Sequence, residues 1–275
     1  MQTILLHLLA ASLYAGLGIH FWRTSIADRK GSPRQSMSIA ERIAMLGAIL
    51  AHGWALQGAL FPGDGMRFGF GFAVSLVIWL AVCFYWIETF YARLDGLHAF
   101  VVVAGVGGSL LPLVFPGQHA LANAGSPAFR AHFVIAMLAY SLFTLAALHA
   151  MLMAIAERQL HSGRLTRPFA YLPPLLTMET LLFRLIGIAF LLLTLTLSSG
   201  IVFSETLFGQ AFRPDHKTVF AIISWLLFGA LLVGRKIWGW RGRVALRWTL
   251  AGFTTLVLAY VGSRFVIEVV LGRAA

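Results

Sequence analysis

Eight long apolar runs constrain the fold of this chain more than any other feature. Each run has about the 20 residues that a helix needs to cross the hydrocarbon core of a bilayer. Short segments with Pro and Gly, such as FPGDG and FPGQH, separate the runs. The sequence therefore predicts an all-α, polytopic membrane helix bundle of about eight transmembrane helices, in a single integral membrane domain over residues 1–275. The predicted helices lie at about 3–22, 40–60, 69–90, 96–115, 130–155, 180–203, 217–235 and 246–270.

Composition and charge support this class and exclude others. Hydrophobic residues make up 59% of the chain and charged residues 11%, whereas about a quarter of a soluble domain is charged. The net charge of +11 would suggest a nucleic-acid partner in a soluble protein. Here the basic residues lie in the gaps between apolar runs, where they report membrane orientation. We therefore expect the chain to lie in the lipid bilayer, and we expect no nucleic-acid partner.

The distribution of Lys and Arg predicts the orientation. Of the 21 basic residues, 15 fall on one side of the predicted membrane and 6 on the other. The richer side is cytoplasmic by the positive-inside rule, which puts both termini on the outer, periplasmic side. The first run is then an uncleaved anchor rather than a signal peptide. A bacterial inner membrane is the simplest location for such a multi-pass chain.

Few motifs point to chemistry. The single cysteine, Cys83, lies inside an apolar run, so the sequence has no intrachain disulfide and no CxxCH site for covalent haem. It also lacks a nucleophile elbow, a Walker loop, an HExxH motif and paired carboxylates at glycosidase-like spacing. We therefore do not expect an enzyme, and any haem would be held non-covalently.

Two histidines stand at the predicted outer ends of apolar runs. His132 opens the fifth run beside Arg130, and His216 opens the seventh beside Lys217. Two imidazoles can serve as the axial ligands of an iron porphyrin, and the two basic residues could bind its propionates. One hypothesis is therefore a b-type haem held by His132 and His216 as metal ligands, with Arg130 and Lys217 as further cofactor-binding residues. The alternative is that both histidines are interfacial residues on unrelated helices.

His52 is a third candidate, because it lies in the middle of a predicted helix with Gln57 five residues later. Polar groups inside a bilayer are costly and often functional. His52 could be an internal haem or proton site, or it could form a hydrogen bond that pairs two helices. The remaining histidines are interpreted as structural or solvated: His7, His20, His98, His119, His149 and His161.

Four charged residues lie within or beside apolar runs. Glu179 and Arg184 bracket the start of the sixth helix at a spacing that separates them on its surface, so we expect each to pair with another helix. Arg264 and Glu268 have the i,i+4 spacing of an intrahelical ion pair. A structural role is the favoured interpretation of all four.

The C-terminal half carries a resemblance to a known family. METLLFRLIGIAFLLLTLTLSSGIVFSETLFGQAF, followed by ISWLLFGALLVGRKIWGWRGRVALRWTLAGFTTLVLAYVGSRFV, resembles the core of the cytochrome c assembly proteins, closest to the eight-helix YpjD and HemX type. The similarity covers about residues 125–268, within a predicted family core at 96–270. Residues 1–95 add N-terminal helices in a compatible number. The resemblance implies an inner-membrane protein that handles haem for cytochrome c biogenesis, with other maturation proteins as partners.

Several positions match the family pattern. His132 matches an outward-facing histidine that precedes a tyrosine, here Tyr140, and that serves as an axial haem ligand in the haem-delivery branches. FRPDHKTVFAIISW takes the place of a tryptophan-rich outer loop and ends at Trp225. The other tryptophans of that loop are absent, with Phe212 and Pro214 near their places. The second outer histidine expected after the last helix is also absent, and His216 would supply that ligand.

Two other function classes remain open at this stage. A membrane scaffold or regulatory partner could retain the family fold without delivering haem, and its basic inner surface would dock a cytoplasmic protein or anionic lipid. A transporter of a small solute could use the intramembrane residues His52, Glu179 and Arg184.

Overall fold

The computed structural model shows a bundle of long membrane-spanning helices. Phe212 and Pro214, like most of the basic loop residues before the second and sixth helices, lie outside the part of the chain that the structure describes. The described residues are 2–27, 37–61, 65–92, 96–121, 124–161, 174–202 and 216–272.

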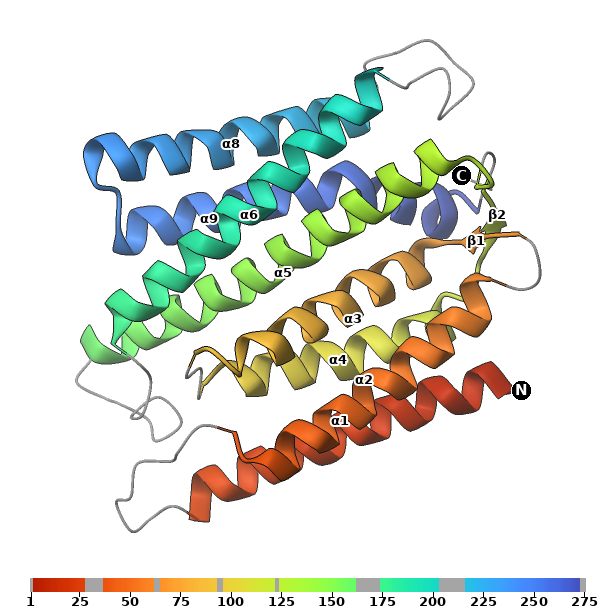
Figure 1. Cartoon of the computed structure of the whole chain (residues 1–275), viewed down its shortest axis with the longest axis horizontal. Helices are drawn as coiled ribbons and strands as arrows, with labels where there is room; N and C mark the ends of the chain where they lie inside the picture. Colours follow the sequence, from red (N-terminus) through yellow and green to blue (C-terminus); the bar gives the residue numbers. More distant parts are fainter. Residues whose placement is uncertain are drawn as a thin grey trace.

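The helices follow one another up and down through the bundle, as Figure 1 shows. Within the described residues, eight helices are long and apolar enough to cross a membrane. The predicted all-α, eight-helix membrane fold is therefore confirmed. The helices are α1 (Gln2–Ala27), α2 (Ile39–Leu60), α3 (Phe70–Glu88), α4 (Leu97–Val114), α5 (Pro127–His161), α6 (Leu175–Val202), α8 (His216–Trp238) and α9 (Gly242–Val257), which continues as the π-helical turns η2 (Leu258–Gly262) and η3 (Phe265–Val270).

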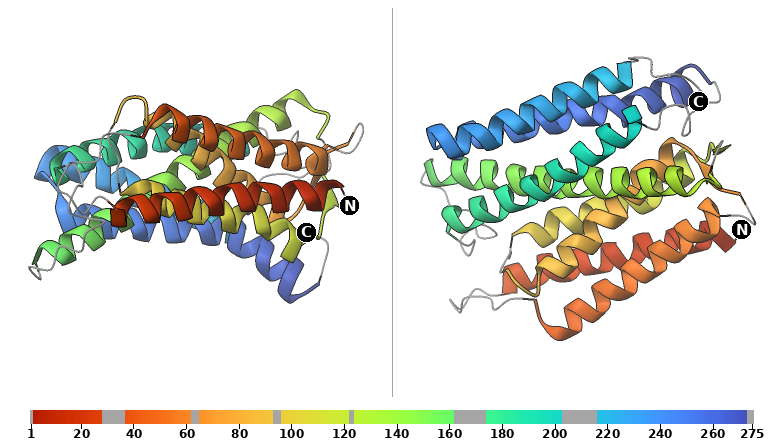
Figure 2. Two further views of the ribbon diagram at one scale, coloured as in Figure 1. Left: turned by 90° about the horizontal axis from the view of Figure 1, so that it is seen from below. Right: turned by 45° about the horizontal axis from the view of Figure 1, so that its top comes forward.

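Helix α5 joins the two halves of the bundle. It packs against α3 and α4 on one side and against α6 and α9 on the other, and Figures 1 and 2 show it between these groups. Helices α1, α2 and α4 complete the first half, and α8 packs on α6 and α9. Both ends of the chain lie at the same end of the bundle in Figure 1, as an even number of spans requires. This end is called the outer end below, following the charge pattern.

Several helix boundaries differ from the prediction by a few residues, most of all around the loop between the fifth and sixth helices. The loop expected over residues 156–179 is shorter, because α5 continues to His161 and α6 begins at Leu175. The ERQL segment consists of good helix formers, and Glu157 is held by an ion pair to Arg243 at 2.8 Å. These polar residues therefore extend helix α5 by nearly two turns beyond the predicted apolar span.

A short pair of strands closes the outer end and was not predicted. Strand β1 (Arg67–Phe68) pairs antiparallel with β2 (His119–Ala120). Two-residue strands are too short to show alternating polarity in a sequence. The neighbouring chain segments approach so closely that a Cβ at Gly69 would lie 1.9 Å from the Gly117 carbonyl oxygen. This pairing connects the α2–α3 segment to the α4–α5 segment.

The end of the last helix is fastened to α3. Arg264 and Glu268 form the predicted i,i+4 ion pair, with Nη1 and Oε1 2.5 Å apart. The other oxygen of Glu268 accepts a hydrogen bond from the Phe70 backbone N–H at 2.6 Å. Gly69, at the N-cap of α3, has no side chain to make this bond. A carboxylate from the far end of the sequence therefore caps α3.

Candidate functional site

The candidate site lies at the outer end of the family core, where α5 and α8 begin and α6 ends. His132 is in the second turn of α5, and its ring is half-buried. Its Nδ1 is 2.8 Å from the hydroxyl oxygen of Ser199 on α6. A Cβ added at the neighbouring Gly200 would lie 3.5 Å from the His132 ring. The imidazole therefore packs against the small residues of the SSG segment at 198–200.

The hydrogen-bond network assigns the tautomer of His132. The Ser199 hydroxyl has one hydrogen, which it donates to the Thr196 carbonyl at 3.0 Å. With that hydrogen on the Thr196 carbonyl, the hydrogen between Ser199 and His132 lies on Nδ1, and the lone pair of the neutral ring is on Nε2. Metal-ligating histidines commonly donate their other N–H to an oxygen in this way. This is the tautomer in which Nε2 can bind a metal.

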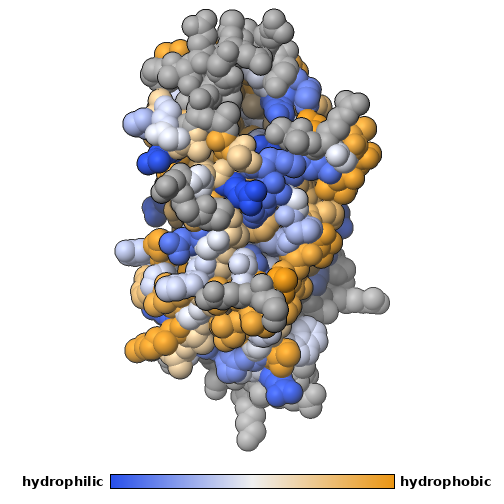
Figure 3. Space-filling view, turned by 90° about the vertical axis from the view of Figure 1, so that its right-hand side faces the viewer, coloured by the Kyte–Doolittle hydropathy of each residue, from blue (hydrophilic) through white to orange (hydrophobic). Residues whose placement is uncertain are grey.

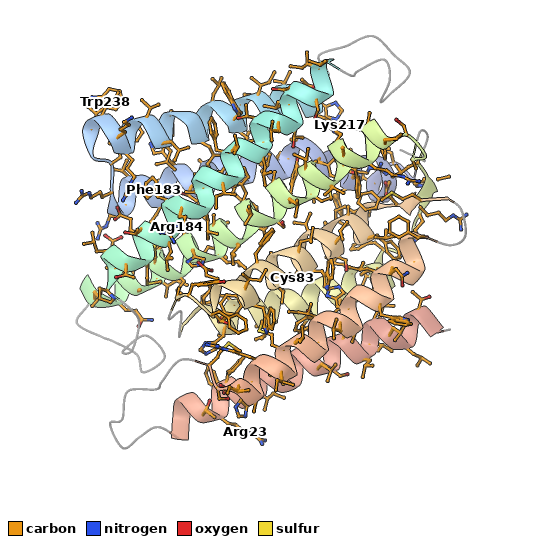
Figure 4. All side chains as sticks on the ribbon, viewed as in Figure 1. Arg23, Cys83, Phe183, Arg184, Lys217 and Trp238 are labelled. Atoms are coloured by element: carbon orange, nitrogen blue, oxygen red, sulfur yellow. The ribbon has the colours of Figure 1, made fainter. Side chains whose placement is uncertain are left out.

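His216 is the first residue of α8 and is exposed. It lies at the same end of the bundle as the beginning of α5, and α6 packs against both α5 and α8. Figure 4 labels its neighbour Lys217 at this end. The assignment of His132 and His216 to one iron stays a prediction.

The two predicted propionate ligands are also at this end. Arg130 is exposed, and its Nε donates to the Ala124 carbonyl at 2.9 Å, which holds the side chain over the start of α5. Lys217 is half-buried on α8. Figure 3 looks onto this end and shows hydrophilic residues near the middle, with hydrophobic residues along one side. An anionic group could therefore approach from the outer surface, although binding by Arg130 and Lys217 stays a prediction.

An aromatic and charged layer lies deeper in the core. Tyr140 is buried, with its ring centroid 6.1 Å from that of Tyr260. The Arg264 guanidinium lies 5.6 Å from the centroid of the Tyr260 ring. Sequence reasoning identified Tyr140 but missed Tyr260, because a tyrosine near the end of an apolar run has no distinctive spacing.

Trp225, the tryptophan that matches the end of the family's outer loop, is fixed to α6. Its Nε1–H donates to the Thr194 hydroxyl at 2.8 Å. Its ring stacks on Phe190 with centroids 5.6 Å apart. The position therefore contributes to packing between α6 and α8 within the site region.

His52 lies in the other half of the bundle. It is fully buried, and its Nε2 is 2.9 Å from the hydroxyl oxygen of Ser75 on α3. This contact is the helix-pairing hydrogen bond that was one interpretation of the sequence. The rings of His7 and Tyr14 pack against it, with centroids 6.2 and 5.9 Å away. The role of His52 as a cofactor ligand stays a prediction, and the packed rings on α1 take up the space beside it.

His7, one of the histidines interpreted as structural or solvated, is buried in the structure. Within the part of the chain that the structure describes, four buried polar atoms of this cluster have no hydrogen bond of normal geometry: both ring nitrogens of His7, His52 Nδ1 and the Tyr14 hydroxyl. The burial arises because α1 packs against both α2 and α4, which its position in the sequence does not reveal.

Other polar side chains near the inner end form helix-to-helix pairs. His20 Nε2 lies 2.9 Å from Glu41, and His149 Nε2 lies 3.1 Å from Glu88. Glu179 pairs with Arg235 of α8, as expected for a contact with another helix. Arg184 is exposed on α6, where Figure 4 labels it.

The donor set suits a haem iron better than a bare metal ion. Within the described residues, no group of three or more His, Cys, Asp or Glu side chains could hold a metal. A haem iron receives four nitrogens from the porphyrin and needs only axial ligands from the protein. A half-buried imidazole with the Nδ1–H tautomer fits that requirement.

Comparisons with known proteins extend the resemblance. YpjD, an inner membrane protein of Escherichia coli K12, is 29% identical over 246 residues, which cover 83% of this chain and 88% of YpjD. An uncharacterized 28.8 kDa protein of Azospirillum brasilense is 35% identical over 143 residues, 51% of this chain and about half (52%) of that protein. The cytochrome c biogenesis protein CcsA of Synechocystis sp. is 35% identical over 86 residues, 31% of this chain and 26% of CcsA.

No solved structure matches the chain. The model of one protein family, described as Cytochrome C assembly protein, matches residues 42–271. The match runs from the first turn of α2 to the end of the last helix. This range takes in most of the chain and agrees with the family predicted from the sequence. The chain therefore belongs to the cytochrome c assembly protein family.

Proposed function

We propose that this multi-pass protein binds b-type haem non-covalently at its outer end, with His132 as an axial ligand, as part of cytochrome c assembly in the bacterial inner membrane. The observation that carries the proposal is the hydrogen bond from His132 Nδ1 to Ser199, whose own hydrogen is committed to Thr196. With Nδ1 bound to Ser199, Nε2 would be the ligating nitrogen. Family membership and the similarity to the inner membrane protein YpjD and the cytochrome c biogenesis protein CcsA support the location and the process.

Four further residues at the outer end have distinct roles in this proposal. Ser199 orients the imidazole, while Arg130 and Lys217 supply positive charge for propionates. His216, at the start of α8, is the second axial ligand. Bound haem would supply the iron centre, and the protein contributes binding and orientation. Without a covalent attachment site, the haem can be passed to a partner protein.

The test is the haem content of the purified protein. Protein from haem-replete cells should contain haem that is released as unmodified b-type haem, and His132→Ala should lose most of it. His20→Ala is the control, because His20 is an exposed histidine paired with Glu41 at the inner end. Equal haem content in wild type and His132→Ala, with both proteins folded, would reject His132 as a ligand.

A further inference from the structure

The turn between α8 and α9 carries five basic residues, and they fall into two groups. Arg235 pairs with Glu179, and its guanidinium lies 3.8 Å from the centroid of the Phe183 ring. Arg243 pairs with Glu157 at 2.8 Å. These two ion pairs fasten the turn to α6 and α5. The second group is exposed, and within the described residues no carboxylate forms an ion pair with it: Lys236, Arg241 and Arg247.

Three tryptophans form a ladder through the same turn. Trp238 stacks on Trp240 with centroids 5.7 Å apart, and Trp240 packs on Trp248 at 5.0 Å. Trp240 is pressed against the backbone of α8, since a Cβ at Gly234 would lie 2.4 Å from its ring. Each exposed cation is close in sequence to a member of this ladder. The three tryptophans are called the aromatic support of the turn below.

The conformation of the turn is also fixed by its backbone. Gly239 and Gly242 have φ angles of +66° and +52°, a region that side chains with a Cβ rarely adopt. The Gly242 N–H reaches the Glu179 carboxylate at 3.4 Å. The shape of the turn is thus set before any ligand arrives, which lowers the entropy cost of binding.

The surroundings of the turn are those of the membrane–water boundary. Trp238 is 66% exposed and Ile237 65% exposed at the end of α8, and Figure 4 shows Trp238 at the end of the bundle opposite Lys217. Val233 and Val244 continue the exposed apolar surface toward the middle of the bundle. Exposed tryptophans at helix ends are typical of the headgroup region, and the charge pattern makes this end cytoplasmic.

We propose that the α8–α9 turn is a binding site for an anionic phospholipid of the inner leaflet. Lys236, Arg241 and Arg247 would bind the headgroup phosphate, while the Trp238–Trp240–Trp248 ladder and Ile237 contact the glycerol and the first part of the acyl chains. Basic clusters on the cytoplasmic side of membrane helices bind anionic lipids in this way. A lipid fits better than a soluble protein, because the exposed cations adjoin apolar surface that faces the bilayer. The site is independent of haem binding at the opposite end.

Native mass spectrometry of the detergent-solubilised protein tests this site. With phosphatidylglycerol added, wild type should retain the lipid, whereas phosphatidylcholine should bind far less. Removing one charge with Arg241→Gln should weaken retention roughly fivefold, and the Gln variants of all three cations combined should weaken it roughly a hundredfold. Arg23→Gln is the matched control, because it removes an exposed cation at the same end of the bundle but on α1.

A second variant tests the aromatic support separately. Gly234→Ala would displace Trp240 while leaving every charge in place, and it should also reduce phosphatidylglycerol retention. Equal retention of both lipids by wild type would overturn the proposal, as would unchanged phosphatidylglycerol retention in the triple variant. A triple variant that keeps the lipid but loses a cytoplasmic partner would reassign the turn to protein docking. The haem content should stay at the wild-type value in all of these variants.

Discussion

A serine hydroxyl lies against an imidazole at two places in this protein, and the surroundings give the two pairs different roles. His132 is half-buried near the outer surface, and its partner Ser199 also lies within hydrogen-bond distance of the Thr196 carbonyl. His52 is fully buried against Ser75 and is enclosed by the rings of His7 and Tyr14. The first arrangement leaves access for a ligand, and the second joins helices.

Ser199→Ala tests the orienting role directly. Loss of the hydrogen bond should lower haem affinity about 10-fold or more, as is typical for residues that orient a metal ligand, while the protein remains folded. Haem titration followed by absorbance measures the change. Ser198→Ala is the control, because that neighbouring side chain is exposed and the hydrogen bond to His132 is made by Ser199. Equal affinities in the two variants would contradict the role of Ser199.

His52→Ala should separate stability from haem binding. Removing a fully buried side chain should lower the free energy of unfolding by about 2–4 kcal/mol, and Ser75→Ala should lower it by about 1–2 kcal/mol through the unpaired imidazole. Thermal unfolding in detergent measures both effects. We expect haem content to be unchanged in the folded fraction. Loss of haem from folded His52→Ala would instead make His52 a cofactor ligand.

At the residue scale, the sequence identified side chains whose position in a span was informative. His132 and His52 stood out because a polar group in an apolar run is rare. Ser199 did not stand out in the sequence, because small residues such as those of SSG are also typical of close helix packing. His7 was judged structural from its place near the end of a run. Its contact with His52 depends on which helices are neighbours.

At the scale of elements, the end of the last helix is held by an unusual cap. Glu268 pairs with buried Arg264 and caps α3 from nearly two hundred residues away in the sequence. Phe265 packs beside it against Phe70 and Phe115. An anionic oxygen at a helix N-terminus is favourable. The cap therefore couples the last helix to the first half of the bundle.

Glu268→Gln should weaken this connection. The amide can still accept the Phe70 N–H, but the Arg264 charge loses its partner, so the free energy of unfolding should fall by about 1–3 kcal/mol. Thermal unfolding in detergent provides the measurement. Glu157→Gln is the comparison, because its partner Arg243 is more exposed and such pairs contribute less than about 1 kcal/mol. An equal or smaller effect at Glu268 would show that the cap contributes little.

The elements themselves could be predicted well because lipid imposes a minimum apolar length on each helix. The eight spans agree with the structure, and their ends differ where polar helix formers extend α5. The β1–β2 pair and the cap by Glu268 could not be predicted. Both depend on contacts between segments far apart in the chain, for which local pattern carries no signal.

At the scale of the whole molecule, the two ends of the bundle differ in chemistry. The outer end holds His132 and the start of α8, and the inner end holds the tryptophan ladder and most of the basic residues that the structure describes. The even number of helices brings both chain ends to one side. Haem binding and lipid anchoring are thus assigned to opposite faces of the membrane.

This orientation predicts the behaviour of reporter fusions at the C-terminus. Alkaline phosphatase fused there should be active in bacterial cells, because it folds only outside the cytoplasm, whereas a green fluorescent protein fusion should be dark. A fusion after Trp238 in the α8–α9 turn should give the opposite pair of results. The reverse pattern would place His132 on the cytoplasmic side and would contradict the assignment of the outer end.

The most direct measurement of the central claim is the absorption spectrum of His132→Gly with and without added imidazole. Removal of the axial ligand should shift the Soret band of the reconstituted protein, and free imidazole in the vacated space should restore the wild-type spectrum. A variant whose spectrum matches wild type without imidazole, or one that imidazole leaves unrestored while the protein is folded and haem-bound, would contradict ligation by His132.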